Sequence, residues 1–201
     1  MPLFGARRCL RKGSRRPVTR PQIYNHECTL CPLHQDANTV CMESTIGQLP
    51  AMIVGEAPGK NEDERGEPFV GQAGRELSKA LRAAGVERED FYITNVVKCR
   101  PPTNRTPEAD EISACAPYLA MEFLTYEPKR ILALGVVAAS TLIRGFSSMG
   151  NGRGEWHVGR GGDIMPTWHP AYVLRQPVHS PIWYQFRGDI HKFVKEVLAN
   201  G

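Results

Sequence analysis

Four of the six cysteines have a spacing that could bind a metal. Cys28 and Cys31 form a C-x2-C pair followed by Pro32, whereas Cys99 and Cys115 lie far downstream with fifteen residues between them. A second C-x2-C pair would favour structural zinc, but the downstream pair is not of that kind. Tetrahedral sulfur sites suit zinc or an iron–sulfur cluster. Spacing alone does not decide between a zinc site, an iron–sulfur cluster and thiols that are merely buried.

A turn rich in acidic side chains follows an apolar run at residues 55–63, GEAPGKNED. Asn95 lies on a later apolar run, and His169 follows another, in Trp168-His169-Pro170. If these runs are parallel strands, acids, an amide and an imidazole meet at one rim of the sheet. The plainer alternatives are a charged turn before a helix and a structural histidine before proline. The shared rim favours a catalytic or binding site.

The segment 98–107, KCRPPTNRTP, is basic and stiffened by proline. One interpretation is a rigid loop with solvated charges. The functional interpretation is phosphate contact, because Lys98, Arg100 and Arg105 precede a helix start and would form an anion site.

Short apolar or β-branched runs alternate with helical patterns along the chain. The predicted strands are residues 51–54, 91–97, 130–135 and 163–168, and the predicted helices are 74–84, a segment opened by Thr106 and Pro107, 136–143 and 183–198. Pro117 should break or restart the second helix. The Gly-rich stretch 147–162 is expected to be one mobile or DNA-facing loop. This alternation predicts an α/β fold with a four-stranded parallel sheet flanked by helices.

The length of 201 residues suits a single domain, and the longest apolar runs are far too short to span a membrane. Seven of the 25 Lys and Arg residues lie in the first twenty positions, which leaves 18 basic against 21 acidic side chains in the rest. We therefore expect a basic, disordered tail at 1–22, which is either a leader or a nonspecific nucleic-acid contact, and one domain at 23–201.

No secretory signal is recognisable at the N-terminus, so we expect a cytoplasmic protein whose thiols stay reduced. A disulfide framework is therefore not expected. Cys9 and Cys41 fit neither cysteine pair and are taken as spare.

Three motifs together resemble the family 4 uracil-DNA glycosylases, which carry a 4Fe–4S cluster. They are GEAPGKNEDERGEPFVGQAG at 55–74, ITNVVKCRPPTNRTP at 93–107 with Cys115 following, and WHPAYVLR at 168–175. The resemblance covers roughly residues 25–198 and implies an uracil-DNA glycosylase-like fold. It also implies a DNA repair hydrolase that releases uracil from DNA and leaves an abasic site. We expect a monomer that does not associate with a membrane.

The resemblance assigns roles where residues match. The cluster ligands that it implies are Cys28, Cys31, Cys99 and Cys115, so the resemblance favours an iron–sulfur cluster over zinc. Phe69 is similar to the aromatic residue that stacks on the extruded base, Asn95 to the amide that reads the uracil edge, and His169 to the histidine facing uracil O2.

Other assignments rest on position within these motifs. Ala57 stands where other glycosylase families carry a catalytic aspartate, so water activation falls to Glu56 or Glu62; we take Glu56 as catalytic and Glu62 as the wall that excludes thymine. Arg100, Arg105, Leu174 and Arg175 are the predicted DNA contacts.

A covalently trapping branch of the superfamily has a histidine at the position of Asn104, so we expect hydrolysis with turnover. Two other functions stay open at this stage. One is a catalytically weak module that binds a modified or damaged base, and the other is a zinc-stabilised nucleotide hydrolase.

Overall fold

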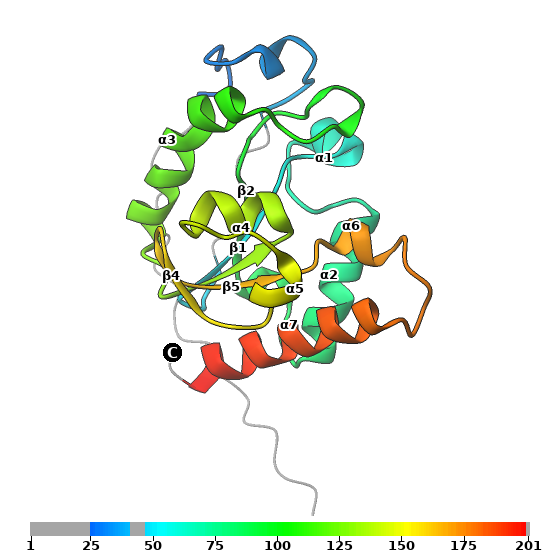
Figure 1. Ribbon diagram of the computed structural model, residues 1–201. Coiled ribbons are helices and arrows are strands. Elements are labelled where there is room, and N and C mark those ends of the chain that lie inside the picture. The colour runs from blue at the N-terminus through cyan, green and yellow to red at the C-terminus, as the bar shows by residue number, and fades with distance from the viewer. Residues whose placement is uncertain (1–24, 41–46, 200–201) are drawn as a thin grey trace, which may run out of the picture.

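The computed structural model describes residues 25–40 and 47–199. Figure 1 shows a central sheet with helices on both sides and the segment that carries Cys28 and Cys31 at one end of the molecule. The predicted tail at 1–22, Cys9 and Cys41 lie outside the described residues.

The sheet has the strand order β2-β1-β3-β5-β4. The strands are β1 Ala51–Gly55, β2 Tyr92–Asn95, β3 Arg130–Leu134, β4 His157–Gly159 and β5 Gly162–Thr167. The four predicted strands are confirmed, and they pair in parallel. β4 was not predicted; it pairs antiparallel with β5 through a tight turn. The fold is therefore α/β with five strands, four of them parallel.

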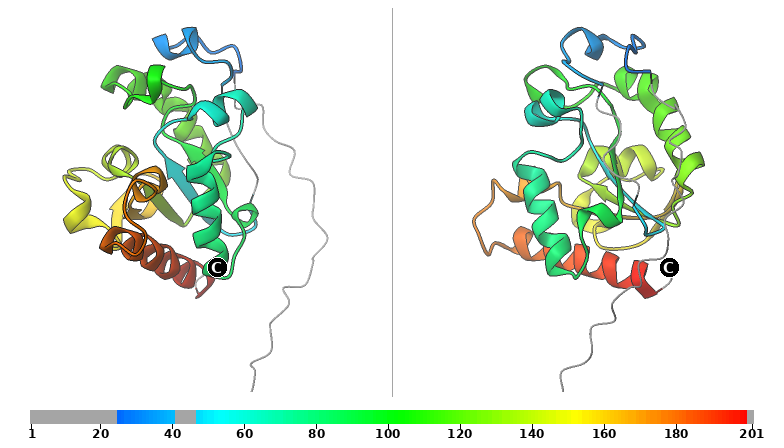
Figure 2. Two further views of the ribbon diagram at one scale, coloured as in Figure 1. Left: turned by 90° about the vertical axis from the view of Figure 1, so that its right-hand side faces the viewer. Right: turned by 180° about the vertical axis from the view of Figure 1, so that it is seen from behind.

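The helices cover both faces of this sheet (Figure 2). They are α1 Lys60–Arg65, α2 Gln72–Ala83, α3 Ala109–Tyr126, α4 Val136–Leu142, α5 Met149–Gly152, α6 Pro170–Val173 and α7 Pro181–Ala199, with 3-10 turns η1 Pro32–Gln35, η2 Arg88–Asp90 and η3 Pro102–Asn104. In the part of the chain that the structure describes, no helix has both the length and the apolar character to cross a membrane.

Alternation along the strands divides the core into two layers. Ile53 of β1 faces a cluster built from α2, α6 and α7, whereas its neighbours Met52 and Val54 face a cluster built from α3 and α4. Both faces are buried, which explains why β1 reads as a continuous apolar run rather than an alternating one.

The start and the continuity of α3 differ from the prediction. Glu108, not Thr106, is the N-cap, and it forms a capping box with Glu111. Pro107 favours an extended conformation at Thr106, which delays the helix. Pro117 lies inside α3 and does not break it. Its ring is on the exposed side of the helix, where water can satisfy the carbonyl group that loses its partner.

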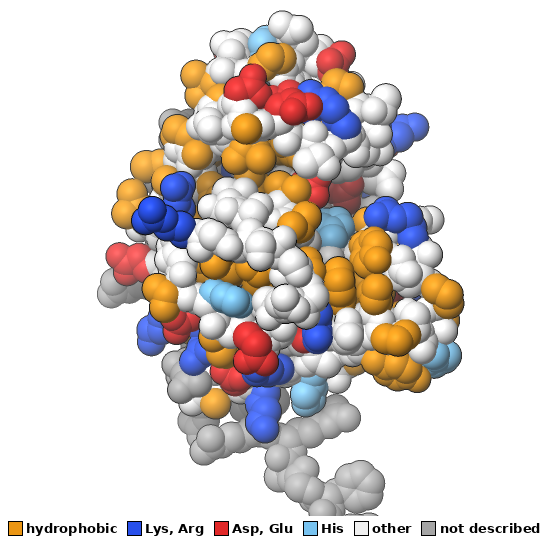
Figure 3. All heavy atoms as spheres, viewed as in Figure 1, with side chains coloured by type: hydrophobic (Ala, Val, Ile, Leu, Met, Phe, Trp, Pro, Cys, Tyr) orange, Lys and Arg blue, Asp and Glu red, His pale blue; other side chains and the backbone are white. Residues whose placement is uncertain are grey.

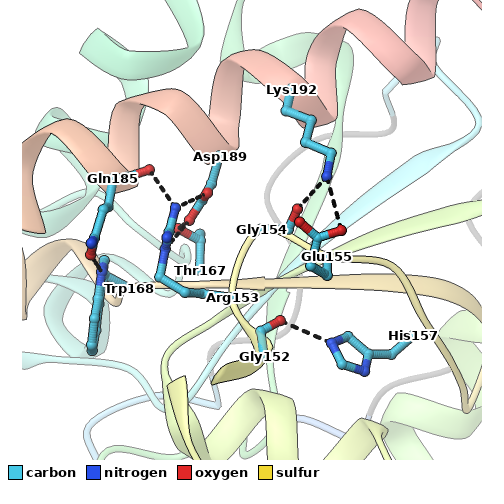
Figure 4. A network of polar contacts seen from close by, with 10 residues as sticks. All are labelled: Gly152, Arg153, Gly154, Glu155, His157, Thr167, Trp168, Gln185, Asp189 and Lys192. Carbon is cyan, nitrogen blue, oxygen red and sulfur yellow. Dashed lines mark hydrogen bonds and ion pairs between the residues drawn. The ribbon is translucent and has the colours of Figure 1, made fainter. Parts of the chain in front are cut away.

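The prediction of a single mobile loop at 147–162 is wrong, because this stretch contains α5 and β4 and is anchored to α7. Figure 4 shows the anchor: the Arg153 guanidinium binds the buried carboxylate of Asp189, and Thr167 Oγ1 donates to the same carboxylate at 2.6 Å. Lys192 Nζ donates to the Gly154 carbonyl at 2.6 Å. This network fixes the end of β5, two residues before His169.

Lys98 is not a phosphate contact, contrary to the prediction. Its ammonium group is buried and donates to Glu122 Oε2 at 2.8 Å, Thr94 Oγ1 at 2.6 Å and the Asn95 carbonyl at 2.7 Å. Glu122 of α3 is also fully buried. A buried ion pair tolerates the loss of one partner poorly, since the other charge is left without compensation.

We therefore expect Lys98→Met to lower the free energy of unfolding by about 3–5 kcal/mol. The double variant Lys98→Met/Glu122→Leu, which leaves no unpaired charge, should lose less. Anaerobic urea unfolding followed by circular dichroism measures both. Lys60→Met is the matched control, because its ion pair with Glu64 is exposed and should contribute less than about 1 kcal/mol. A Lys98→Met protein as stable as the parent would contradict this account.

Candidate active site and cysteine site

A pocket of about 660 Å³ opens at the carboxyl ends of the parallel strands. The turn after β1, the end of β2, the residues after β3 and the segment from β5 into α6 all contribute to it. Its lining includes these predicted site residues: Glu56, Ala57, Glu62, Phe69, Asn95, Arg105, His169 and Arg175. Parallel pairing thus brings together side chains that are more than a hundred residues apart in the sequence.

The floor of the pocket combines an amide with an aromatic ring. Asn95 is 1% exposed, and its Oδ1 atom forms no hydrogen bond with the protein. The Phe69 ring and this oxygen both lie against Gly55, where an added Cβ would fall 2.5 Å from Asn95 Oδ1. A buried acceptor without a partner is costly unless a ligand supplies the donor.

The backbone of Phe69 is held in a conformation that is unusual for a large side chain. Its φ is 56°, in the left-handed region. The half-buried Arg88 guanidinium donates to the carbonyl groups of Phe69 and Pro68, the latter at 2.9 Å. Gly74 is also required, because a Cβ there would overlap the Phe69 carbonyl. These contacts offset the backbone strain and fix the ring at the pocket wall.

His169 is the N-cap of α6, and its Nδ1 accepts a hydrogen bond from the Ala171 N–H at 3.2 Å. Burial lowers the pKa of His169 to about 4, and the charge of Arg175 contributes further. The imidazole is therefore neutral near pH 7, and its single proton is on Nε2. Its ring lies 5.9 Å from that of Phe69, centroid to centroid. The arrangement presents a neutral hydrogen-bond donor.

The three acids of the turn have different environments. Burial raises the pKa of Glu56, and a hydrogen bond from the Thr106 side chain opposes this shift. Glu62 also lines the pocket, with Oε1 accepting from the Gly71 N–H at 2.7 Å. Asp63 is fully buried and points away from the rim, binding the backbone and side chain of Asn38. Asp63 thus fastens the cysteine-bearing segment to α1.

The predicted DNA contacts lie at or beside the mouth of the pocket. Arg105 lines it and forms a two-point ion pair with Glu111, at 2.8 and 2.6 Å. Arg100 Nε donates to Asn104 Oδ1 at 2.7 Å and does not line the pocket. Arg175 lines the pocket, whereas Leu174 lies outside it with 46% of its surface exposed.

A second, smaller cavity is lined by Cys28, Cys31, Cys99 and Cys115. Cys99 and Cys115 are buried. The pKa of Cys99 is raised to about 12 and that of Cys115 to about 11, mainly by burial and in smaller part by the neighbouring cysteines. Within residues 25–40 and 47–199, no three His, Cys, Asp or Glu side chains surround a position for a single metal ion.

The donor set of this second cavity nevertheless fits iron and sulfur. All four donors are thiols, which are the ligands of iron–sulfur clusters. The Lys98 N–H donates to Cys115 Sγ at 3.3 Å, and Tyr118 forms a hydrogen bond with Cys28. Such donors stabilise a thiolate in a buried site.

Several residues at the pocket were not predicted. Tyr172 and Thr106 line it, and both lie within or next to motifs already noted, so the motifs themselves were a sufficient signal. Val136 follows β3, where the rule for strand ends would have found it. Arg88 and Met149 had no local signal, because only the tertiary fold brings them to this region.

Comparison with known proteins gives consistent matches. The Uracil DNA glycosylase superfamily matches residues 43–187. Three relatives named type-4 uracil-DNA glycosylase come from Pyrobaculum aerophilum, Thermotoga maritima and Saccharolobus solfataricus. The Pyrobaculum protein is 46% identical, and the match covers 87% of this chain and 89% of the relative. The Thermotoga protein is 43% identical, and the match covers 74% of this chain and 79% of the relative. The Saccharolobus protein is 39% identical, and the match covers 87% of this chain and 83% of the relative. This chain therefore belongs to the uracil DNA glycosylase superfamily, and within it to the type-4 uracil-DNA glycosylases.

Proposed function

We propose that the pocket binds an extruded uracil and that the chain hydrolyses the bond between this base and its deoxyribose. The products are free uracil and an abasic site in otherwise intact DNA. The observation that carries this proposal is the buried Asn95 Oδ1, which has no protein partner at the floor of the pocket. The names of the relatives support the same activity.

Asn95 suits uracil by the direction of its hydrogen bonds. Its oxygen accepts from the N3–H of uracil, and its amide nitrogen donates to O4. Cytosine has an acceptor at N3 and an amino group at C4, so both contacts would be mispaired. Phe69 stacks on the base, and Ala57 leaves room beside it. Glu62, held by the Gly71 N–H, forms the wall against the methyl group of thymine.

Two groups act on the reacting atoms. Breaking the glycosidic bond leaves negative charge on the uracil, and the Nε2–H of His169 stabilises that charge at O2. Glu56 orients water and accepts its proton as the sugar carbon is attacked. Burial of Glu56 raises its pKa toward the range in which a carboxylate is an effective base.

The enzyme is proposed to be monofunctional. Among the described residues that line the pocket there is no lysine to form a Schiff base with the sugar. Asn104 stands in place of the trapping histidine and accepts from Arg100. Arg100, Arg105 and Arg175 contact phosphates, and Leu174 fills the space that the extruded base leaves. A monomeric state and a cytoplasmic location stay predictions.

We further propose that Cys28, Cys31, Cys99 and Cys115 hold a 4Fe–4S cluster. When bound, the cluster supplies a rigid link between the segment at 25–40, the residues after β2, and α3. The chain's own contribution is to place four sulfur ligands together, two of them, Cys99 and Cys115, in a buried environment that otherwise favours the neutral thiol.

The direct test of function is incubation with a uracil-containing oligonucleotide. Uracil should be released, and strand cleavage should appear only after alkali. Asn95→Ala should lower the rate about a hundredfold or more with little loss of stability, because Oδ1 has no protein partner to lose. Equal rates in the parent and in Asn95→Ala would contradict the proposed base recognition, and strand cleavage without alkali would contradict the monofunctional mechanism.

The pH dependence separates the two catalytic groups. Since the pKa of His169 is about 4, this residue stays neutral from pH 8 to below pH 5, and kcat/KM should show no step near 6.5. The pKa of Glu56 is raised, so the rate should increase with pH as its carboxyl group ionises and then level off. Glu56→Gln should remove that rise. A step near 6.5 that disappears in His169→Ala would overturn the neutral-donor assignment.

Iron content tests the cluster independently of activity. Anaerobically purified protein should be brown and contain about four iron ions per chain. Cys99→Ser should lose most of this iron, whereas Cys9→Ser, which changes a cysteine outside the proposed set, should keep it. Colourless protein that contains zinc and no iron would refute the cluster.

A further inference from the structure

The segment 164–188 contains no Asp or Glu, although the chain has 21 such residues. It runs from β5 through α6 to the first turns of α7 and carries Arg175 and Arg187 together with four aromatic side chains of Trp and Tyr. Arg187 is paired with Glu76, whereas Arg175 lies 5.8 Å from the centre of the Tyr172 ring at the edge of the pocket. Aromatic rings beside a positive charge are typical of a surface that binds single-stranded nucleic acid.

Three rings form a cluster where the α6–α7 connection enters α7. Trp183 and Tyr184 meet edge to face with their centroids 5.0 Å apart, and the His179 ring lies 5.1 Å from Trp183. His179 Nδ1 is 3.1 Å from the Tyr184 hydroxyl group. We call these three residues the ring cluster.

The ring cluster is both fixed and accessible. The Arg187 guanidinium lies 4.3 Å above the Trp183 ring, and it is itself bound to Glu76 of α2 at 2.8 Å. Trp183 also packs against the hydrophobic core. Tyr184 is 57% exposed, so its ring is accessible to a ligand. The base of the cluster is therefore rigid, and its outer ring faces solvent.

This surface continues from the proposed active site. The same connection begins at His169, Tyr172 and Arg175, which line the pocket, and ends at the ring cluster. Figure 3 shows hydrophobic side chains gathered on this side of the molecule, where Leu174, Val178 and Tyr184 are exposed. A DNA strand that leaves the pocket along this connection would meet these residues next.

We propose that the ring cluster is a stacking platform for unpaired bases that flank the extruded uracil. The inference rests on the proposed function and adds the residues that would hold an unpaired strand beside the pocket. Every base has a π-face, so stacking on Tyr184 and Trp183 needs no particular sequence. Bases within a duplex are already stacked on their neighbours, and the platform therefore acts on single strands.

DNA fits this surface better than a second copy of the chain. A surface that binds a protein partner would gain from a mixture of charges. The segment 164–188 contains no acid, and since Arg187 is paired with Glu76, its available charge is the positive one of Arg175. Its continuity with the pocket also matches a strand that must pass through the active site.

The test uses a fluorescein-labelled single-stranded oligonucleotide without uracil and the full chain with its metal content intact. Tyr184→Ala should weaken binding about tenfold, the typical loss of one stacked base. Tyr184→Phe keeps the ring and loses only the hydroxyl group, so it should bind like the parent. Leu124→Ala is the matched surface control, since Leu124 is 72% exposed on α3 and outside this segment.

Uracil release gives the second measurement. Tyr184→Ala should lower kcat/KM about tenfold on a single-stranded substrate and leave the value on a duplex substrate unchanged. Unchanged single-strand binding, or an equal loss on both substrates, would overturn the platform. So would sedimentation showing that the parent is a dimer and Tyr184→Ala a monomer, because the surface would then join two copies.

Failure of the platform and failure of the proposed function give different results. If the parent releases no uracil from either substrate, the proposed function is wrong, yet binding of the uracil-free strand still tests the platform. If uracil is released normally while Tyr184→Ala binds like the parent, only the platform is wrong.

Discussion

The buried ammonium group of Lys98 joins the two sites of this protein. It binds the Asn95 carbonyl, at the end of β2 beside the pocket, and the Glu122 carboxylate on α3, the helix that carries Cys115. The backbone N–H of the same residue donates to Cys115 Sγ. Strand β2, α3 and the cysteine cavity are therefore positioned by one residue. The position of Asn95 depends on this ion pair. The arrangement of the thiols around their cavity depends on it as well.

Much of the architecture follows from local sequence patterns. Apolar runs such as AMIV gave the buried strands, and the periodic spacing of Leu77 and Leu81 gave α2. The shortest elements were missed. β4 has only three residues, one of which is the exposed Val158, and pairing with β5 rather than its own sequence makes it a strand. The Gly-rich stretch at 147–162 is anchored rather than mobile because Asp189, which is distant in the sequence, binds Arg153.

The site could be predicted as far as its motifs reach. Parallel pairing brings Glu56, Asn95 and His169 to one edge, as the order of strands and helices indicated. Charge type alone was misleading: Lys98 and Asp63 are buried structural groups, although both lie among residues that read as functional. The left-handed backbone of Phe69 and its support by Arg88 depend on tertiary contacts, so nothing in the adjacent sequence could reveal them.

Gly55 contributes to the sheet and to the pocket in two separate ways. Its backbone pairs with β2, and its carbonyl accepts from the Val96 N–H at 2.9 Å, which any amino acid could do. Its missing side chain is what lets the aromatic ring and the amide oxygen come within reach of each other. An added methyl group would overlap the Phe69 ring and the Asn95 oxygen, so both side chains would have to move although the backbone pairing of the strand needs no change. The absence of a side chain at Gly55 therefore matters to the shape of the pocket more than to the pairing of the strands.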